Sequence, residues 1–285
     1  GLIPKPSGRI TGGTASLNGQ NMLNITAADA NKFRGSQVGM IFQDPMSALN
    51  PTMTIGDQIA ETLIVHKGKS HKEASTIAVE LLERTKISEP AKRAKQYPFE
   101  FSGGMLQRAM IAQTIACKPK VLIADEPTTA LDVTIQAQIL EILLDIQESE
   151  GMSIILITHD LAVVAQMADR VAVMYAGQIV ESGTVNDIFY RSSHPYTLGL
   201  KSAIPSKTAN RDLPLIPISG SPPDLFQPPL GCGYSERCSF AMNVCAKHQP
   251  SDFKISPSHK ASCWLHHTNQ KSQQGQMQLR DFSVD

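Results

Sequence analysis

Short apolar runs alternate with amphipathic segments along much of the chain. Three runs, at residues 38–42, 121–124 and 153–157, are bounded by polar or turn-forming residues, which is typical of buried parallel strands. Apolar residues recur at helical spacing within residues 103–116 and 133–147. The pattern therefore predicts an α/β fold with a mainly parallel sheet.

Turn-forming residues add local predictions. Residues 12–13 and 18–19 indicate a strand-turn-strand segment within residues 8–24, with strands at 9–11 and 15–17, and Ala176-Gly177 predicts a later hairpin. Each of these segments is short.

Gly68-Lys69-Ser70 resembles the end of a phosphate-binding loop, but Leu63 stands where that loop requires a glycine. Ser70 and Glu73, three residues apart, instead predict a capping box. This segment is therefore expected to begin an ordinary helix.

Each predicted parallel strand is followed by residues with functional side chains. Asp125 and Glu126 come after residues 121–124, whereas Gln43 and His159 follow the other two strands. In open α/β sheets, ligands bind at the carboxyl ends of the strands. Adjacent carboxylates there suit an Mg²⁺ ion and an attacking water, although alone they are equally typical of solvated acids at a strand end.

The sequence Ser102-Gly103-Gly104 precedes one of the predicted helices. Serine is a favourable N-cap, and glycines leave backbone N–H groups open to a phosphate at the positive end of the helix. By itself this sequence predicts an ordinary cap. It becomes specific because a strand ending in two acids follows it, and Asp132 lies six residues beyond Glu126.

In this order, the segments resemble the ATP-binding subunits of ABC transporters. In that family, residues 102–104 would begin the signature motif, residues 123–126 would close Walker B and residues 130–132 would form the D-loop. The resemblance implies a P-loop NTPase-like core within residues 1–192, with a helical subdomain at about 55–115. It also implies ATP and Mg²⁺ as cofactors.

Two departures from the commoner LSGGQ signature narrow this resemblance. Phe101 and Met105 replace its first and last residues, and the sequence PMSALNP occupies residues 45–51. Both features resemble the oligopeptide and dipeptide importer branch. The function implied is ATP hydrolysis that energises peptide import.

The resemblance also implies catalytic roles. Glu126 would be the general base and Asp125 would bind Mg²⁺. Gln43 would reach Mg²⁺ and the attacking water, and His159 would contact the γ-phosphate and position that water.

The remaining site residues would act between subunits. Ser102, Gly103 and Gly104 would contact ATP bound to a second ATPase subunit, and Asp132 would contact the opposite site. The other partners implied are two membrane permeases and an extracytoplasmic peptide-binding protein. This arrangement would place the chain peripherally on the cytoplasmic face of the membrane.

The phosphate-binding sequence GxxGxGK[ST] of this family does not occur in the chain. We therefore expect an N-terminally truncated ATPase that lacks Walker A. The main grip on the nucleotide comes from that loop. The chain alone is consequently expected to be inactive in ATP hydrolysis.

Charge and spacing weigh against other functions that share these motifs. Lys and Arg total 26, as do Asp and Glu, so no broad basic field favours nucleic acid as a partner. Non-transport ABC ATPases of DNA repair insert a long coiled coil, for which the 59 positions from Gln43 to Ser102 leave no room. A translation-associated ATPase would carry two cassettes. A catalytically silent partner subunit is disfavoured by intact Glu126 and His159.

The last third of the chain differs in composition. His194-Pro195-Tyr196-Thr197 opens a proline-rich segment and resembles the start of the peptide-importer extension, expected here over residues 193–265. Residues 266–285 are rich in Gln and Ser and are predicted to be a disordered tail. Four cysteines fall within the extension: Cys232, Cys238, Cys245 and Cys263.

Three states of these cysteines are open. Their spacing lacks the paired C-x2-C of zinc ribbons and the common ferredoxin patterns. Disulfides are disfavoured in a reducing cytosol. Some resembling importers imply thiolate ligation of a [4Fe-4S] cluster, whereas zinc and unligated thiols are the alternatives.

Overall fold

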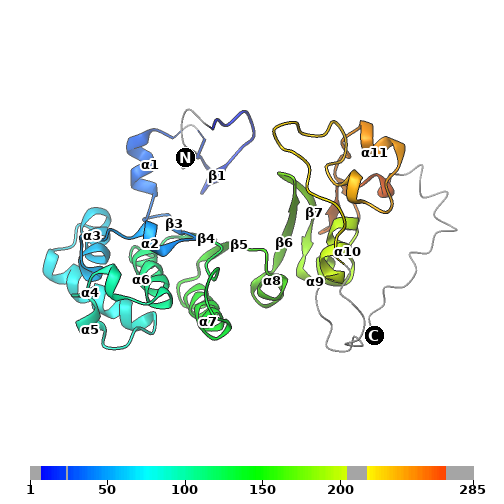
Figure 1. Ribbon diagram of the computed structural model, residues 1–285. Helices are drawn as coiled ribbons and strands as arrows, with labels where there is room; N and C mark the ends of the chain where they lie inside the picture. The colour runs from blue at the N-terminus through cyan, green and yellow to red at the C-terminus, as the bar shows by residue number, and fades with distance from the viewer. Residues whose placement is uncertain (1–7, 24, 204–216, 268–285) are drawn as a thin grey trace. The chain divides into compact units, whose positions relative to one another are not determined.

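The computed structural model describes residues 8–23, 25–203 and 217–267 of the chain. The chain divides into two compact units, Gly1–Val163 and Val164–Asp285, which are described separately (Figure 1). The boundary predicted at residue 192 lies inside the second unit and stays a prediction. Most of the predicted tail lies outside the described residues.

The first unit is built on a parallel sheet with the strand order β3-β4-β5. The strands are β3 (Val38–Ile41), β4 (Val121–Asp125) and β5 (Ser153–Ile157). Their registers pair Ile41 with Ala124 and Ala124 with Leu156, so the three carboxyl ends lie level with one another. The predicted parallel sheet and its α/β class are confirmed.

Helices form most of the rest of the first unit. They are α1 (Ala27–Phe33), α2 (Pro45–Ala48), α3 (Ile55–Lys67), α4 (His71–Arg84), α5 (Pro90–Arg93), α6 (Gly103–Ile115) and α7 (Val133–Glu150). A 3₁₀ turn occupies Pro98–Glu100, and α8 (Leu161–Met167) spans the division between the units.

The predicted capping box at α4 is confirmed, because Ser70 and Glu73 exchange hydrogen bonds between side chain and backbone. Gly68 ends α3 in the left-handed conformation, with φ 63°. The apparent phosphate-binding loop is therefore a helix end followed by a helix start.

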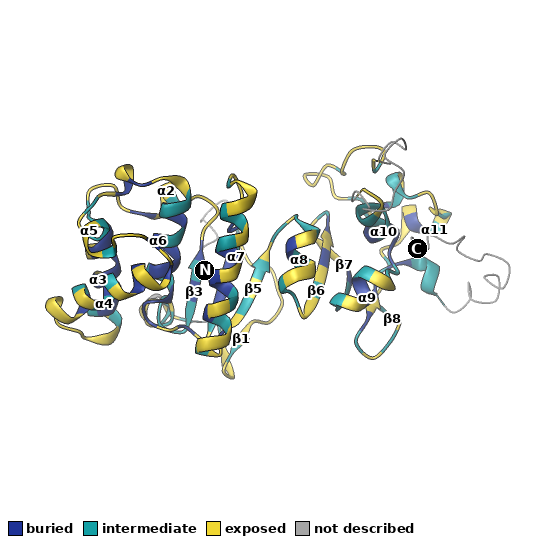
Figure 2. Cartoon of the chain, turned by 90° about the horizontal axis from the view of Figure 1, so that it is seen from below, coloured by how far each residue is buried: buried dark blue, intermediate teal, exposed yellow. Residues whose placement is uncertain are grey.

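Burial of the sheet is one-sided. Helices α6 and α7 cover one face (Figure 1), where Leu122 and Ala124 are completely buried. On β5, Ile155 and Ile157 are 53% and 47% exposed, and Figure 2 shows the partial exposure of this strand. The prediction that residues 153–157 are buried was wrong, because Ile155 and Ile157 project from the sheet face opposite the one that carries Leu122 and Ala124.

The N-terminal hairpin differs from its prediction. Strands β1 (Ser16–Leu17) and β2 (Gln20–Asn21) pair across Asn18-Gly19, whereas residues 9–11 are not in a strand. Asn18 and Gly19 have φ values of 50° and 78°, as the tight hairpin turn requires. Of the two turn signals, Asn18-Gly19 therefore marks the hairpin turn.

The second unit contains an antiparallel sheet with the order β6-β7-β9-β8. The elements are β6 (Arg170–Tyr175), β7 (Gln178–Thr184), α9 (Val185–Tyr190), α10 (Pro195–Ser202), α11 (Asn243–Lys247), β8 (Phe253–Lys254) and β9 (Lys260–Ala261). Two 3₁₀ turns occupy Ser235–Arg237 and Trp264–His266. The predicted hairpin is confirmed as β6–β7, and the C-terminal segment adds two strands to it.

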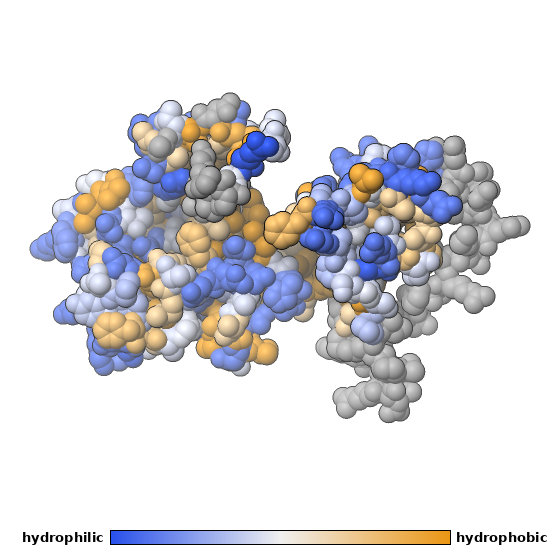
Figure 3. Space-filling model, turned by 45° about the horizontal axis from the view of Figure 1, so that its top comes forward, coloured by the Kyte–Doolittle hydropathy of each residue, from blue (hydrophilic) through white to orange (hydrophobic). Residues whose placement is uncertain are grey.

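Among the described helices, none is both long and apolar enough to cross a bilayer. On the face shown in Figure 3, apolar patches interrupt a largely hydrophilic surface. Exposed large apolar side chains include Phe99 and Val133 in the first unit and Phe226 and Leu230 in the second. Scattered residues of this kind are common on globular proteins and identify no interface by themselves.

Candidate functional site

Glu126 is the centre of a polar cluster at the carboxyl edge of the parallel sheet. Its Oε2 accepts hydrogen bonds from Gln43 Nε2 at 2.8 Å and from Thr129 Oγ1 at 2.8 Å. Its Oε1 lies 3.2 Å from His159 Nδ1. The three side chains expected at this edge, those of Gln43, Glu126 and His159, therefore lie together.

The local backbone holds Glu126 at this place. Its N–H donates to the Ile157 carbonyl at 2.9 Å, which ties the end of β4 to the end of β5. Its φ of 46° is in the left-handed region, so the chain turns sharply after Asp125. The turn directs the Glu126 side chain toward the residues that follow β3 and β5.

Capped helices fix the two neighbouring loops. Asp44 follows Gln43 and accepts a hydrogen bond from the Met46 N–H at 2.9 Å, which caps α2. Asp160 follows His159 and accepts from the Ala162 N–H at 2.8 Å. Short capped connections of this kind limit the positions that Gln43 and His159 can adopt.

The cluster favours an ionised Glu126. Hydrogen bonds from Thr129, His159 and Gln43 lower the pKa of its carboxyl group, because all three stabilise the charged form. The Glu126 side chain is 26% exposed and that of His159 is 77% exposed. An ionised carboxylate that water can reach is suited to accept a proton.

The residues expected to bind Mg²⁺ lie beside this carboxylate. Asp125 is the last residue of β4, and the Gln43 amide donates through Nε2, which leaves Oε1 available to a cation. In the described ranges, no three His, Cys, Asp or Glu side chains converge to hold a metal ion. Mg²⁺ usually takes one or two carboxylates with water and phosphate oxygens, so Asp125 and Gln43 fit a site that substrate would complete.

The Ser-Gly-Gly segment begins α6 as predicted, but its residues have different surroundings. Ser102 occupies the N-cap position without a capping hydrogen bond from its side chain. A Cβ on Gly103 would meet no atom within 4 Å, whereas one on Gly104 would lie 2.8 Å from Ile135 Cγ2. Gly103 thus leaves the helix end open, and Gly104 allows α6 to pack closely on α7.

Asp132 caps the neighbouring helix. Its Oδ1 accepts a hydrogen bond from the Ile135 N–H at 3.0 Å, which begins α7. Because Ile135 also lies against Gly104, the first turns of α6 and α7 pack directly on each other. Ile135 was not anticipated as part of the site, since it belongs to the apolar pattern of an ordinary helix.

Thr129 was also missed. It lies three residues after Glu126 in a turn that Pro127 begins, and its spacing from Glu126 is the only signal that could have found it. Gln136 contributes a further contact that the sequence did not indicate, because its Nε2 donates to Asp160 Oδ2 at 3.2 Å.

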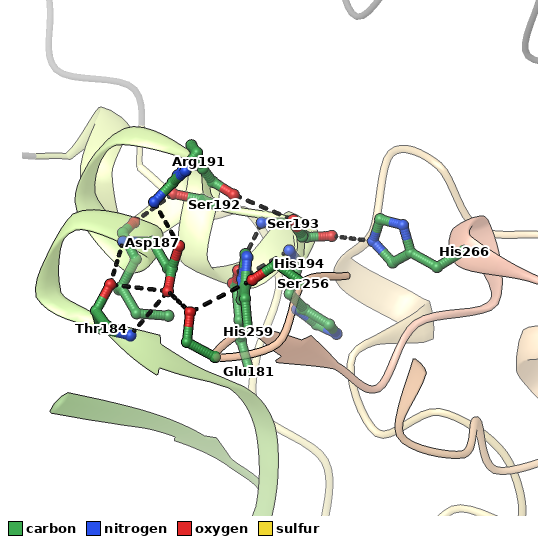
Figure 4. Close-up of polar contacts among 12 residues, drawn as sticks. Glu181, Thr184, Asp187, Arg191, Ser192, Ser193, His194, Ser256, His259 and His266 are labelled. Carbon is green, nitrogen blue, oxygen red and sulfur yellow. Dashed lines mark hydrogen bonds and ion pairs between the residues drawn. The ribbon is translucent and has the colours of Figure 1, made fainter. Parts of the chain in front are cut away.

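A second polar cluster lies in the second unit, around Glu181 of β7 (Figure 4). The completely buried Glu181 carboxylate accepts from the N–H groups of Ser193 at 2.6 Å and His194 at 3.1 Å. Its Oε1 also lies 2.7 Å from His259 Nε2. The cluster joins β7 to the start of the His-Pro-Tyr-Thr segment and to the connection between β8 and β9.

The four C-terminal cysteines lie around one small pocket, which Cys232, Cys238, Cys245 and Cys263 line together with His194 and Trp264. All of them are free thiols. Burial raises the pKa of Cys263 to about 12 and raises those of Cys232 and Cys238. These three thiols are therefore protonated at neutral pH. None of the four cysteines belongs to a metal-binding group of the described residues. The expected iron-sulfur cluster is not supported.

Cys117, the remaining cysteine, is fully buried, and its Sγ lies 3.5 Å from the Thr62 carbonyl oxygen. Burial raises the pKa of its thiol. This environment is typical of a small core residue and not of a reactive thiol.

Comparison with known proteins gives independent evidence about the family of this chain. Residues 3–129 match the family model described as ABC transporter, and residues 180–245 match the model described as oligopeptide/dipeptide transporter, C-terminal region. Among solved structures, a dimer of the ATP-binding cassette MJ0796 bound to ADP and Pi is similar, with a TM-score of 0.56 and 26% identity. That similarity covers 61% of this chain and 74% of MJ0796.

Curated relatives are more similar still. The dipeptide transport ATP-binding protein DppD of Bacillus subtilis is 51% identical over 93% of this chain and 79% of its own length. The oligopeptide transport ATP-binding protein OppD of Bacillus subtilis is 52% identical, over 93% of this chain and 74% of its own length. OppD of Escherichia coli is 47% identical over 90% of this chain and 76% of its own length. This chain therefore belongs to the oligopeptide and dipeptide transporter family of ABC ATP-binding proteins.

Proposed function

We propose that this chain is part of an ATPase subunit that hydrolyses ATP to drive the import of peptides once a phosphate-binding loop is supplied, with Glu126 as the general base. The observation that carries the proposal is the contact of one carboxylate with Gln43 and His159, which come from separate strands of the sheet. Similarity to peptide-transport ATP-binding proteins supports the same reaction.

The geometry suggests how the reaction proceeds. Glu126 accepts a proton from water as the water oxygen attacks the γ-phosphorus, and the bond from phosphorus to the bridging oxygen of ADP breaks. Gln43 and His159 orient the water and the γ-phosphate. Asp125 and the Gln43 amide oxygen would hold Mg²⁺, which neutralises charge on the phosphate oxygens.

A second ATPase subunit would complete each site. Ser102, Gly103 and Gly104 present the exposed start of α6, where N–H groups and the helix dipole favour a phosphate. In the proposed assembly this end contacts ATP held by the partner, and Asp132 lies at the same contact. The further proposed partners are two permeases and an extracytoplasmic binding protein, with the ATPase on the cytoplasmic side of the membrane.

The rival functions receive less support. The relatives reported above are named as peptide transport proteins, and the chain matches the C-terminal region of that family. A DNA-repair or translation-associated ATPase would not be expected to carry that region. A catalytically silent partner subunit would not need the contacts that Gln43 and His159 make with Glu126.

Replacing Glu126 by Gln in the full-length subunit tests the catalytic role. The amide keeps the shape of the side chain but cannot accept the proton, so we expect the kcat of ATP hydrolysis to fall by about 100-fold or more. ATP binding should persist. The matched control is Glu148→Gln, since Glu148 is an exposed residue of α7. Full turnover in the Glu126 variant would reject the proposed base.

The [4Fe-4S] cluster remains a secondary proposal. The position of four thiols around one pocket supports it, whereas the absence of a metal-binding group among the described residues opposes it. Anaerobic purification followed by iron and acid-labile sulfide analysis decides between them. A brown protein with iron and sulfide that disappear in Cys238→Ser would support a cluster. A colourless protein without iron would reject it.

A further inference from the structure

The Glu126 carboxylate has one donor from its own turn and two from distant segments. Gln43 follows β3, and His159 follows β5. Thr129 is three residues from Glu126, and its hydroxyl donates to Oε2 at 2.8 Å. The local donor therefore differs in kind from the other two, because its position does not depend on the packing of separate strands.

The turn that carries Thr129 is well defined. The Thr129 N–H donates to the Glu126 carbonyl at 3.2 Å, and the Leu131 N–H donates to the Thr128 carbonyl at 3.3 Å. Pro127 and Thr128 are buried beneath it. With Glu126 already in the left-handed region, this turn returns the Thr129 hydroxyl to the carboxylate that precedes it.

The two oxygens of the Glu126 carboxylate have different hydrogen-bond donors. Oε2 accepts from both Thr129 and Gln43, whereas Oε1 faces only His159 among the hydrogen bonds that the structure gives it. Gln43 and His159 also have roles toward cation, water and phosphate in the proposed reaction. The proposed reaction gives Thr129 no such role, so its hydrogen bond to Glu126 can serve the carboxylate alone.

We propose that Thr129 is a positioning residue that holds Oε2 of Glu126 and thereby presents Oε1 to the attacking water. This inference rests on the proposed function of Glu126 as the general base. It assigns the proton to Oε1, beside His159, and it gives Thr129 no contact with ATP. A base held in one orientation reaches the geometry for proton transfer more often than one that rotates freely.

Replacement of Thr129 by Val tests this inference in the full-length subunit within its assembled transporter. Valine keeps the branched shape and removes the hydroxyl. We expect kcat to fall about 10-fold, which is the size expected for a lost hydrogen bond to a charged group, with KM for ATP changed less than about 2-fold. Thr129→Ser, which restores the hydroxyl, should recover most of the rate.

Thr76→Val is the matched control, because Thr76 is exposed and its hydroxyl donates to the Lys72 carbonyl of its own helix. The control should hydrolyse ATP normally. In the Glu126→Gln background, Thr129→Val should cause no further loss, because the carboxylate that it orients is gone. Melting temperatures of the variants show whether each is folded.

Several outcomes would overturn the inference. They are an unchanged kcat in Thr129→Val, a raised KM with an unchanged kcat, a Ser variant as slow as the Val variant, or an additive loss in the double variant. The function itself is tested separately. If Glu126→Gln abolishes turnover and Thr129→Val does not affect it, the general base stands and only the role of Thr129 is rejected.

Discussion

His194 shows how burial sets the charge of a single residue. Its side chain is almost completely buried, and its Nδ1 accepts a hydrogen bond from the Tyr196 N–H at 3.1 Å. Burial, with a smaller contribution from the nearby His266, lowers the pKa of His194 from 6.5 to about 4. The imidazole is therefore neutral at pH 7 and acts as the cap of α10.

This burial predicts a pH-dependent stability. A depressed pKa stabilises the folded state above pH 6.5, and that stability is lost as the pH falls from 6.5 through about 4, by roughly 3 kcal/mol in total. Thermal unfolding between pH 7.5 and 4.5 measures it. His194→Asn, whose oxygen can also accept from the Tyr196 N–H, should flatten the profile, whereas exposed His248→Asn should not. Equal slopes in all three proteins would contradict this account.

At the scale of residues, the sequence predicts which side chains form the site, but it does not predict the side chain that orients Glu126. Gln43, Glu126 and His159 each follow an apolar run, so the geometry of a parallel sheet is sufficient to bring them together. Thr129 depends on the left-handed conformation of Glu126, which no pattern of apolar residues indicates. Its hydroxyl could therefore be placed only once the turn was known.

At the scale of elements, close contact between two helix starts joins the signature segment to α7. A Cβ on Gly104 would lie 2.8 Å from Ile135 Cγ2, which is closer than carbon atoms pack. Asp132 fixes the same helix start through its capping hydrogen bond to the Ile135 N–H. Displacement of either helix would therefore move the other.

Gly104→Ala should lower the stability of the full-length protein by about 1 to 3 kcal/mol, the usual cost of an overpacked contact. Gly103→Ala is the matched control, because its Cβ would meet no atom within 4 Å. In the Ile135→Ala background, the cost of Gly104→Ala should largely disappear. Thermal unfolding measures all four proteins, and an equal loss of stability in both glycine variants would refute the contact.

Elements with strong local signals were predicted, and those that depend on distant pairing were not. The capping box of α4 and the apolar stripe of α7 are local, and both are found. Strands β8 and β9 contain two residues each, so no periodicity could indicate them. Strand β9 pairs with β7 from about 80 positions away, and β8 pairs with β9. The exposure of β5 likewise depends on which elements lie beside it.

At the scale of the whole molecule, the described C-terminal residues 217–267 belong to the second unit and pack into it. Strand β9 pairs with β7 of the β6–β7 hairpin. Glu181 adds a buried connection, since its carboxylate accepts from Ser193 and His194 and lies beside His259. Removing one partner from a buried charged cluster of this kind is usually costly, so the cluster stabilises this arrangement.

The central claim is that the carboxylate gathered with Gln43 and His159 drives peptide import through ATP hydrolysis. The most direct measurement places the full-length subunit and its transporter partners in vesicles and follows ATP hydrolysis and uptake of a labelled peptide together. Glu126→Gln should reduce both by about 100-fold or more while ATP still binds, and Glu148→Gln should leave both unchanged. Peptide uptake and hydrolysis at the normal rate in the Glu126 variant would contradict the account.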